Sequence, residues 1–204
     1  MNDAGDINLG RTFMAGIWDQ NPVFRLLLGM CPTLAVTAAV KPALTMSLCV
    51  MFVLTCSNIV ASLLRNLLKP HLRILMFTLT IATFVTIADL FVKAYAPLMS
   101  TKLGPYLPLI IVNCIIIGRA EVCASKNNLI ISIVDAIGMS IGFTFALCLL
   151  ASVRELLGSG TVFDYPVLSS SWFTPWTALV MPGGAFLALG LLLGLINFIT
   201  KRNK

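Results

Sequence analysis

Charged side chains are scarce in this chain. Asp, Glu, Lys and Arg make up 11% of its 204 residues, and there is a single histidine. A soluble domain carries about 25% charged residues, so the composition excludes a soluble hydrolase and argues against nucleic acid as a partner. Apolar residues make up 58%, and the mean hydropathy is +0.96. The composition therefore predicts an integral membrane protein, and the net charge of +6 fits spanning helices with basic flanks.

Several motifs are also missing. The sequence has no nucleophile and base pair, phosphate-binding glycine loop or nucleotide fingerprint outside the apolar segments, so we expect no catalysis from this chain alone. None of the six cysteines belongs to a CxxC pair, which excludes a self-contained zinc or ferredoxin-type site on spacing. Residues 1–20 lack an apolar core before a cleavage site, so we expect the first spanning helix to direct insertion.

Spanning helices need about 20 apolar residues to cross a hydrocarbon core about 30 Å thick. Four stretches meet this requirement, namely 43–64, 72–95, 129–152 and 177–200. Two further stretches, 26–40 and 107–118, are too short and are interrupted or preceded by proline. We predict that these two are re-entrant or broken helices covered by other protein.

The order short, long, long occurs twice, which suggests an internal repeat. Cys31 and Cys114 take the same place in the two short segments, and Arg65 and Arg154 the same place after the next helix. Each half contributes three passages, so the second half must enter from the opposite side. We therefore predict an all-α membrane protein whose six transmembrane passages form an inverted 3+3 repeat. Chance likeness between apolar segments is the alternative.

A single transmembrane domain would then cover residues 1–204, with repeat halves at about 22–98 and about 105–200. Residues 8–20 are expected to form a short interfacial helix, because apolar residues recur there every four positions. Basic residues favour cytoplasmic loops. In the predicted topology, ten Lys and Arg residues lie on the side of the membrane that holds both termini, and four lie on the other side. Both termini are therefore predicted to be cytoplasmic. The ten are Arg11, Arg25, Arg65, Lys69, Arg73, Arg119, Lys126, Lys201, Arg202 and Lys204, and the four are Lys41, Lys93, Lys102 and Arg154.

Cys31 and Cys114 are the first candidate site. Paired interrupted segments at matching positions are the best sequence pointer to function in inverted-repeat membrane proteins. The repeat would bring the two thiols together near the middle of the membrane, where they could pack, form a disulfide or bind metal. Two thiolates are too few for a closed zinc or iron-sulfur site, so a metal centre would need two more cysteines from another chain.

Acidic residues inside the apolar segments are further candidates, because ionisable groups in a membrane often mark functional sites. Asp89 has Lys93 one turn further on, so a neutralising pair is preferred over an ion path. Asp135 is expected to face an ion path or polar cavity, or to pair with Arg119. Arg119 and Glu121, two residues apart, cannot pair on one helical face and suggest a membrane-surface anchor or a subunit contact.

Several segments resemble the paired membrane subunits of the Rnf and Nqr respiratory complexes, over nearly the whole chain from about residue 16 to about residue 199. These segments are Asn21-Pro22, Leu28-Gly29-Met30-Cys31, Leu34-Ala35-Val36-Thr37, Asn113-Cys114-Ile115-Ile116-Ile117-Gly118-Arg119-Ala120-Glu121 and Arg154-Glu155-Leu156-Leu157-Gly158-Ser159-Gly160. The sequence is more similar to the E-type member of the Rnf complexes than to its D-type counterpart in the Nqr complexes, because of residues 18–22 and the pair Cys31-Pro32. The Nqr assignment is the alternative.

The resemblance implies a complex in the bacterial cytoplasmic (inner) membrane that moves electrons between reduced ferredoxin and NAD, coupled to Na+ or H+ transport. It implies that the E-type chain and an oppositely inserted paralogue, the A-type chain, each give two cysteines to a shared 2Fe-2S cluster. Here those ligands would be Cys31 and Cys114. Flavin, NAD and ferredoxin chemistry would belong to the B-, C-, D- and G-type Rnf subunits.

Two rival functions follow from the same residues. An inverted-repeat secondary ion transporter would use Asp135 in an ion site and leave the cysteines merely packed. A purely structural subunit would seat redox partners and carry electrons through neither cysteine. The sequence leaves open which ion moves and whether it passes through this chain.

Overall fold

The structure is a computed structural model and describes residues 9–14, 16–17, 20–65, 72–162, 165–166 and 181–202. Its α-helices are α1 (Leu9–Met14), α2 (Met30–Val36), α3 (Val40–Leu64), α4 (Arg73–Tyr95), α5 (Pro97–Leu103), α6 (Cys114–Arg119), α7 (Leu129–Ser159) and α9 (Pro182–Arg202). A 3-10 helix, η3 (Leu107–Ile110), precedes α6, and a π-helix, η4 (Ala120–Ala124), follows it. A two-residue antiparallel pair, β1 (Thr161–Val162) and β2 (Tyr165–Pro166), follows α7.

Within the described ranges, five helical stretches are long and apolar enough to cross a membrane. They are Val40–Leu64, Arg73–Tyr95, Leu107–Ala124, Leu129–Ser159 and Pro182–Thr200. The prediction of a helical membrane protein is therefore confirmed, and the four long predicted stretches appear, although residues 177–180 of the last one lie outside the described ranges. The remaining predicted passage, 26–40, is the first along the chain. It contains the seven-residue helix α2, which is too short to span a membrane, so six passages stay a prediction. The second short segment is longer than predicted because η4 continues the helical run to Ala124.

The predicted end of the third long helix was wrong. We expected α7 to stop at Ser152, before Arg154 and Glu155, but it continues to Ser159. Charged residues end an apolar helix when they must reach water, yet both side chains are buried here and hydrogen-bonded to other parts of the chain. Arg154 is therefore a buried residue of a helix and not the loop cation that the orientation count assumed.

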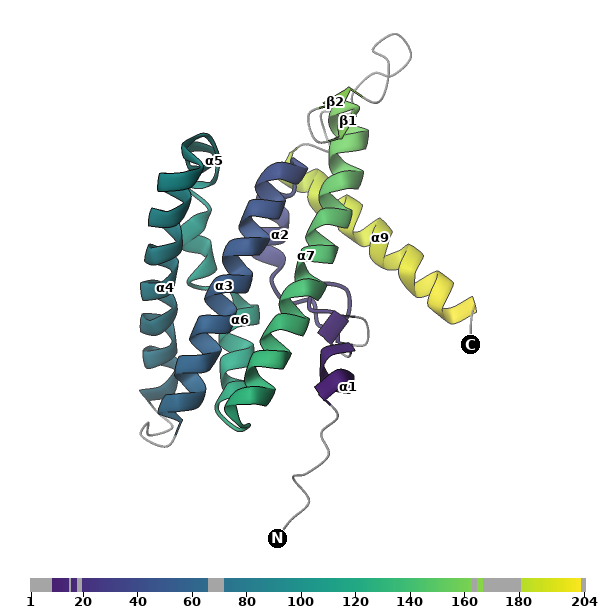
Figure 1. Cartoon of the computed structure of the whole chain (residues 1–204). Coiled ribbons are helices and arrows are strands. Elements are labelled where there is room, and N and C mark those ends of the chain that lie inside the picture. Colours follow the sequence, from purple (N-terminus) through teal and green to yellow (C-terminus); the bar gives the residue numbers. More distant parts are fainter. Residues whose placement is uncertain are drawn as a thin grey trace.

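The centre of the molecule is the pair α3 and α7, which pack side by side along much of their length (Figure 1). Their contact buries completely a set of apolar side chains that includes Val50, Val53, Met139, Phe143 and Leu147. Helix α4 flanks α3 and exposes apolar side chains such as Leu75 and Leu79. Exposed apolar faces of this extent mark surfaces that meet lipid or other protein.

The N-terminal segment packs against α7 rather than standing apart. The backbone of Phe13 lies close to Gly138, and a Cβ on Gly142 would come 2.6 Å from the Gly16 carbonyl oxygen. Small residues permit this approach. Helix α1 lies within the predicted interfacial segment 8–20, of which residues 8, 15, 18 and 19 lie outside the described ranges.

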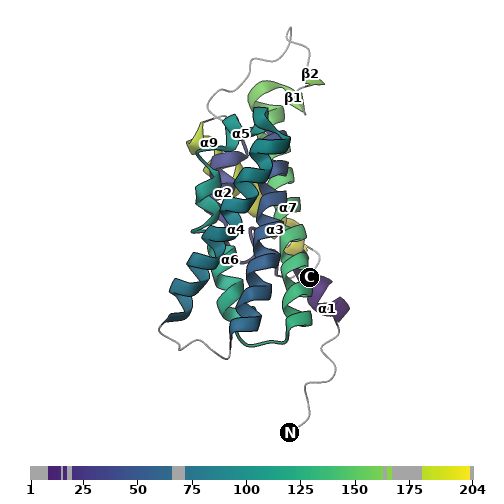
Figure 2. The same ribbon diagram turned by 60° about the vertical axis from the view of Figure 1, so that its left-hand side comes forward.

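Figures 1 and 2 show how the two short helices are placed. Helix α2 runs from the middle of the molecule to the end where α3 begins, and α6 runs from the same level toward the opposite end, where η4 leads into α7. Helix α3 runs from one end to the other, α4 returns, α7 follows the direction of α4, and α9 runs back again. The beginnings of α2 and α6 therefore lie at mid-depth, with opposite directions.

Candidate functional site

The segments that carry Cys31 and Cys114 meet at Gly29, two residues before Cys31. Cys31 is the second residue of α2 and Cys114 is the first residue of α6. The backbone N–H of Gly29, two residues before Cys31, donates a hydrogen bond of 2.9 Å to the Cys114 Sγ. The beginnings of the two oppositely directed helices are thus joined at a cysteine sulfur.

Gly29 is the residue that makes this junction possible. It caps α2 with φ 73° and ψ 24°, the left-handed conformation that glycine adopts at no steric penalty. A Cβ at this position would overlap the side chain of Ile115 and come within 3.0 Å of Phe143. Two requirements, the positive φ and the close approach of α6 and α7, therefore coincide at Gly29. We did not predict this role from the sequence.

Two asparagines shape the chain around the cysteines. Asn113 caps α6, and its Oδ1 accepts a hydrogen bond of 3.1 Å from the Ile115 amide. The Oδ1 of Asn21 accepts from the amides of Val23 and Phe24, and its Nδ2 donates to the Gly142 carbonyl at 3.1 Å. Both side chains are buried, and Asx side chains favour such caps and turns because they replace backbone partners. Both fall in the segments that carry the family resemblance.

The two thiols are accessible and unbridged. Cys31 and Cys114 are exposed, whereas Cys49 and Cys123 are buried. All six cysteines are free, so the disulfide alternative is not realised in this structure. Across the described ranges, no group of three or more His, Cys, Asp or Glu residues is placed to hold a metal ion. Two cysteines are too few to close a four-cysteine cluster site, so a cluster here would need ligands from a second chain.

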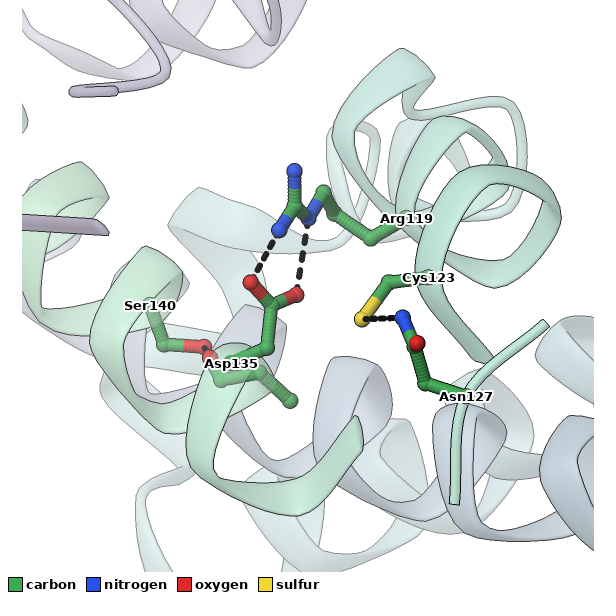
Figure 3. A network of polar contacts seen from close by, with 6 residues as sticks. Arg119, Cys123, Asn127, Asp135 and Ser140 are labelled. Atoms are coloured by element: carbon green, nitrogen blue, oxygen red, sulfur yellow. Dashed lines mark hydrogen bonds and ion pairs between the residues drawn. The ribbon is translucent and has the colours of Figure 1, made fainter. Parts of the chain in front are cut away.

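Asp135 pairs with Arg119, one of the two interpretations offered for it. Figure 3 shows the Arg119 guanidinium facing both carboxylate oxygens, with Nε 2.8 Å from Oδ2 and Nη2 bonded to Oδ1. The side chains are 13% and 4% exposed. Cys123 lies beside this pair with its Sγ toward Asn127 (Figure 3). The pair ties the end of α6 to α7, and an ion path at Asp135 stays a prediction.

Asp89 and Lys93 form the predicted pair near the end of α4. The Lys93 Nζ lies 2.6 Å from the Asp89 Oδ2, and the side chains are 56% and 27% exposed. Glu121 lies in η4, and its Oε2 is buried with no hydrogen-bond partner in the described part of the chain. Arg119 is engaged by Asp135 instead, so the sequence neighbours Arg119 and Glu121 do not neutralise each other.

Arg65 and Arg154, which match in the predicted repeat, make corresponding contacts. Arg65, at the end of α3, donates to the Asn127 carbonyl at 2.6 Å, in the turn before α7. Arg154, in the last turns of α7, donates to the Thr37 hydroxyl at 2.6 Å, in the turn before α3. Each arginine therefore holds the turn that leads into the other's helix.

The chain is a helical membrane protein, as its long apolar helices and their exposed apolar faces show. The junction of α2 and α6 is its candidate site for a metal cluster. The family described as "Rnf-Nqr subunit, membrane protein" matches residues 9–193. The chain belongs to this family, which confirms the resemblance seen in the sequence.

Its relatives are similar over almost their full length. The E subunit of the Na+-translocating ferredoxin:NAD+ oxidoreductase complex of Acetobacterium woodii is 45% identical, over 96% of this chain and 100% of the relative. The E subunit of the proton-translocating ferredoxin:NAD+ oxidoreductase complex of Clostridium ljungdahlii is 41% identical, over 93% and 89%. The E subunit of the ion-translocating oxidoreductase complex of Methanosarcina acetivorans is 41% identical, over 95% and 92%.

Proposed function

We propose that the chain is the E-type membrane subunit of an ion-translocating ferredoxin:NAD+ oxidoreductase complex of the Rnf type. In it, Cys31 and Cys114 would supply half of the ligands of a 2Fe-2S cluster, and a paralogous A-type chain would supply the other half. The observation that carries the proposal is the junction of α2 and α6, where Gly29 donates to the Cys114 sulfur. Relatives that cover the chain almost completely and are named as the E subunit support it.

Each residue at the junction has a definite task in this function. A bound 2Fe-2S cluster would accept and release one electron at a time. Cys31 and Cys114 are exposed, so a second chain can reach them. Gly29 offers its N–H to a ligand sulfur, and such hydrogen bonds stabilise the charge on the sulfur. Ile115 and Phe143 are completely buried beside Gly29 and keep that side of the junction dry.

The position of the junction suits electron transfer across a membrane. A bilayer core about 30 Å thick is long for one transfer step, and the beginnings of α2 and α6 lie midway along the long helices (Figure 1). A cluster at this level would divide the distance into two shorter steps. Ion movement coupled to these steps is part of the proposal.

We further propose the inverted 3+3 repeat and six passages, with both termini on the cytoplasmic side of the inner membrane. Opposite directions of α2 and α6 support the inverted relation, as do the corresponding contacts of Arg65 and Arg154. The B-, C-, D- and G-type subunits would carry the flavin, NAD and ferredoxin chemistry. The rival transporter needs an available carboxylate at Asp135, which here is bound to Arg119.

The experiment is EPR spectroscopy of the whole complex, extracted with its native partner chains and reduced. It compares wild type with Cys114→Ala and with the matched control Cys148→Ala, a half-buried cysteine of α7. The proposal predicts a 2Fe-2S component in the wild type and the control that is missing from Cys114→Ala while assembly is intact. An identical spectrum with unchanged iron content in Cys114→Ala would overturn it.

A further inference from the structure

We infer that Arg154 is a positioning residue for the cysteine junction, and that it acts through a hydrogen-bonded chain formed with Thr37, Thr33 and Gly29. The inference deepens the proposed function, because its effect on a potential depends on a cluster held by Cys31 and Cys114. Three observations support it: Arg154 is buried, hydrogen bonds connect it to Gly29 through the two threonines, and the neighbouring Glu155 binds the beginning of α3.

Arg154 is a charged side chain in the buried interior of the protein. It is 2% exposed, and a buried guanidinium is tolerated only when its donors are satisfied. Its Nη1 lies 2.6 Å from the Thr37 Oγ1 and 3.5 Å from the Leu34 carbonyl oxygen. Its Nη2 lies 3.3 Å from the Met181 carbonyl oxygen, just before α9. The guanidinium therefore binds the end of α2 from a helix more than a hundred residues away.

From Thr37 a chain of hydrogen bonds runs back along α2 to the cysteine. The Thr37 hydroxyl accepts from Arg154 and donates to the Thr33 carbonyl at 2.5 Å. The Thr33 hydroxyl donates to the Gly29 carbonyl at 2.7 Å, and the Gly29 amide donates to the Cys114 Sγ. A carbonyl oxygen can only accept, so each threonine hydroxyl donates its one hydrogen to the carbonyl four residues back, and the Thr37 oxygen is left to accept from Arg154. Both threonines are completely buried.

Glu155 supplies a second anchor next to the first. Its Oε2 accepts a hydrogen bond of 2.7 Å from the amide of Val40, the first residue of α3. Adjacent residues of α7 thus hold the end of α2 and the beginning of α3. A helix of seven residues is too short to be stable on its own, so α2 depends on these contacts for its position. Consequently the placement of the Gly29 amide depends on them as well.

The effect is expected at the Cys114 sulfur. Hydrogen bonds to cysteine sulfurs are one of the properties that set the potential of an iron-sulfur cluster, and they favour the reduced, more negative state. Weakening the N–H···S bond of Gly29 should therefore make the midpoint potential more negative. Arg154 would act at a distance, since Thr37, Thr33 and Gly29 separate it from the sulfur.

The test uses Thr33→Val and Thr37→Val in the intact complex, because valine keeps the shape and removes the hydroxyl. Thr33→Ser and Thr37→Ser are the rescue variants, since serine keeps the hydroxyl. Thr83→Val is the matched control, because its hydroxyl also bonds the carbonyl four residues back, but on the exposed face of α4. The readouts are the EPR midpoint potential and hydrogen exchange of residues 28–36.

We expect a more negative potential and faster exchange of residues 28–36 in both valine variants. The serine variants and Thr83→Val should behave as wild type. The inference is overturned if the valine variants keep the wild-type potential and exchange. If the wild type has no cluster that depends on Cys114, the proposed function fails instead. Hydrogen exchange then decides whether the hydrogen bonds of Thr33 and Thr37 position α2. Faster exchange in the valine variants alone would support this positioning role, and unchanged exchange would refute it.

Discussion

The backbone amide of Gly29 donates a hydrogen bond to the sulfur of Cys114, 85 positions further along the chain, at 2.9 Å. This contact joins α2 to α6 and places Cys31 and Cys114 at one junction. Gly29 is therefore part of the candidate site together with the two cysteines. Variants of Gly29 and of the contacts around it therefore test the two-cysteine half-site.

Gly29→Ala is expected to damage the junction. An alanine at φ 73° costs about 1–2 kcal/mol in backbone energy, and its Cβ must displace Ile115 or Phe143. Iron content per purified complex and thermal stability should both fall. The matched control is Gly190→Ala in α9, where a Cβ meets no atom within 4 Å. Unchanged iron in Gly29→Ala would contradict the role given to this residue.

Asp135→Asn should destabilise the protein strongly, because it leaves the Arg119 guanidinium without its charged partner in a mostly buried position. Breaking a buried pair in this way costs about 3–5 kcal/mol. The double variant Asp135→Asn with Arg119→Gln should recover part of the loss, since no uncompensated charge remains. Thermal unfolding of the complex measures both.

The control for this prediction is the exposed pair in α4. Asp89→Asn removes an i,i+4 partner from Lys93, whose side chain is 56% exposed, and such pairs contribute about 0.3–0.5 kcal/mol. Equal melting temperatures for Asp89→Asn and Asp135→Asn would show that Arg119 and Asp135 are not a structural pair.

Gly142→Ala is expected to loosen the N-terminal segment. A Cβ there would lie 2.6 Å from the Gly16 carbonyl oxygen, so backbone must move, and the Asn21 side chain would lose its bond to the Gly142 carbonyl. Limited proteolysis should cut faster within residues 9–21. Gly194→Ala, where a Cβ meets nothing within 4 Å, is the control. Equal cleavage of the two variants would contradict the packing described.

The long helices and the main site could be predicted from the sequence because those features follow local rules. Apolar run length predicted α3 and α4 to within three residues at each end. The matching of Cys31 with Cys114 predicted that their two segments come together, as the contact of Gly29 with Cys114 shows. Both inferences depend on patterns within one segment or between two similar segments, and such patterns are visible without coordinates.

The features that could not be predicted depend on tertiary contacts. Arg154 and Glu155 were expected to end a helix because charges usually leave an apolar environment, yet α2 and α3 supply their partners from 115 to 120 positions away. Gly29 resembles any other turn glycine until Ile115 and Phe143 are placed beside it. One clue to the longer α7 was available, since no proline lies between residues 129 and 159 to end the helix.

The most direct test counts iron and acid-labile sulfide in the complex purified from cells, comparing wild type with the double variant Cys31→Ala and Cys114→Ala. A 2Fe-2S cluster shared by two chains contains two irons and two sulfides. We predict that the double variant lacks about two of each per complex, while flavin and the remaining iron are unchanged. Equal iron and sulfide in the two preparations would contradict the claim that these cysteines hold half of a cluster.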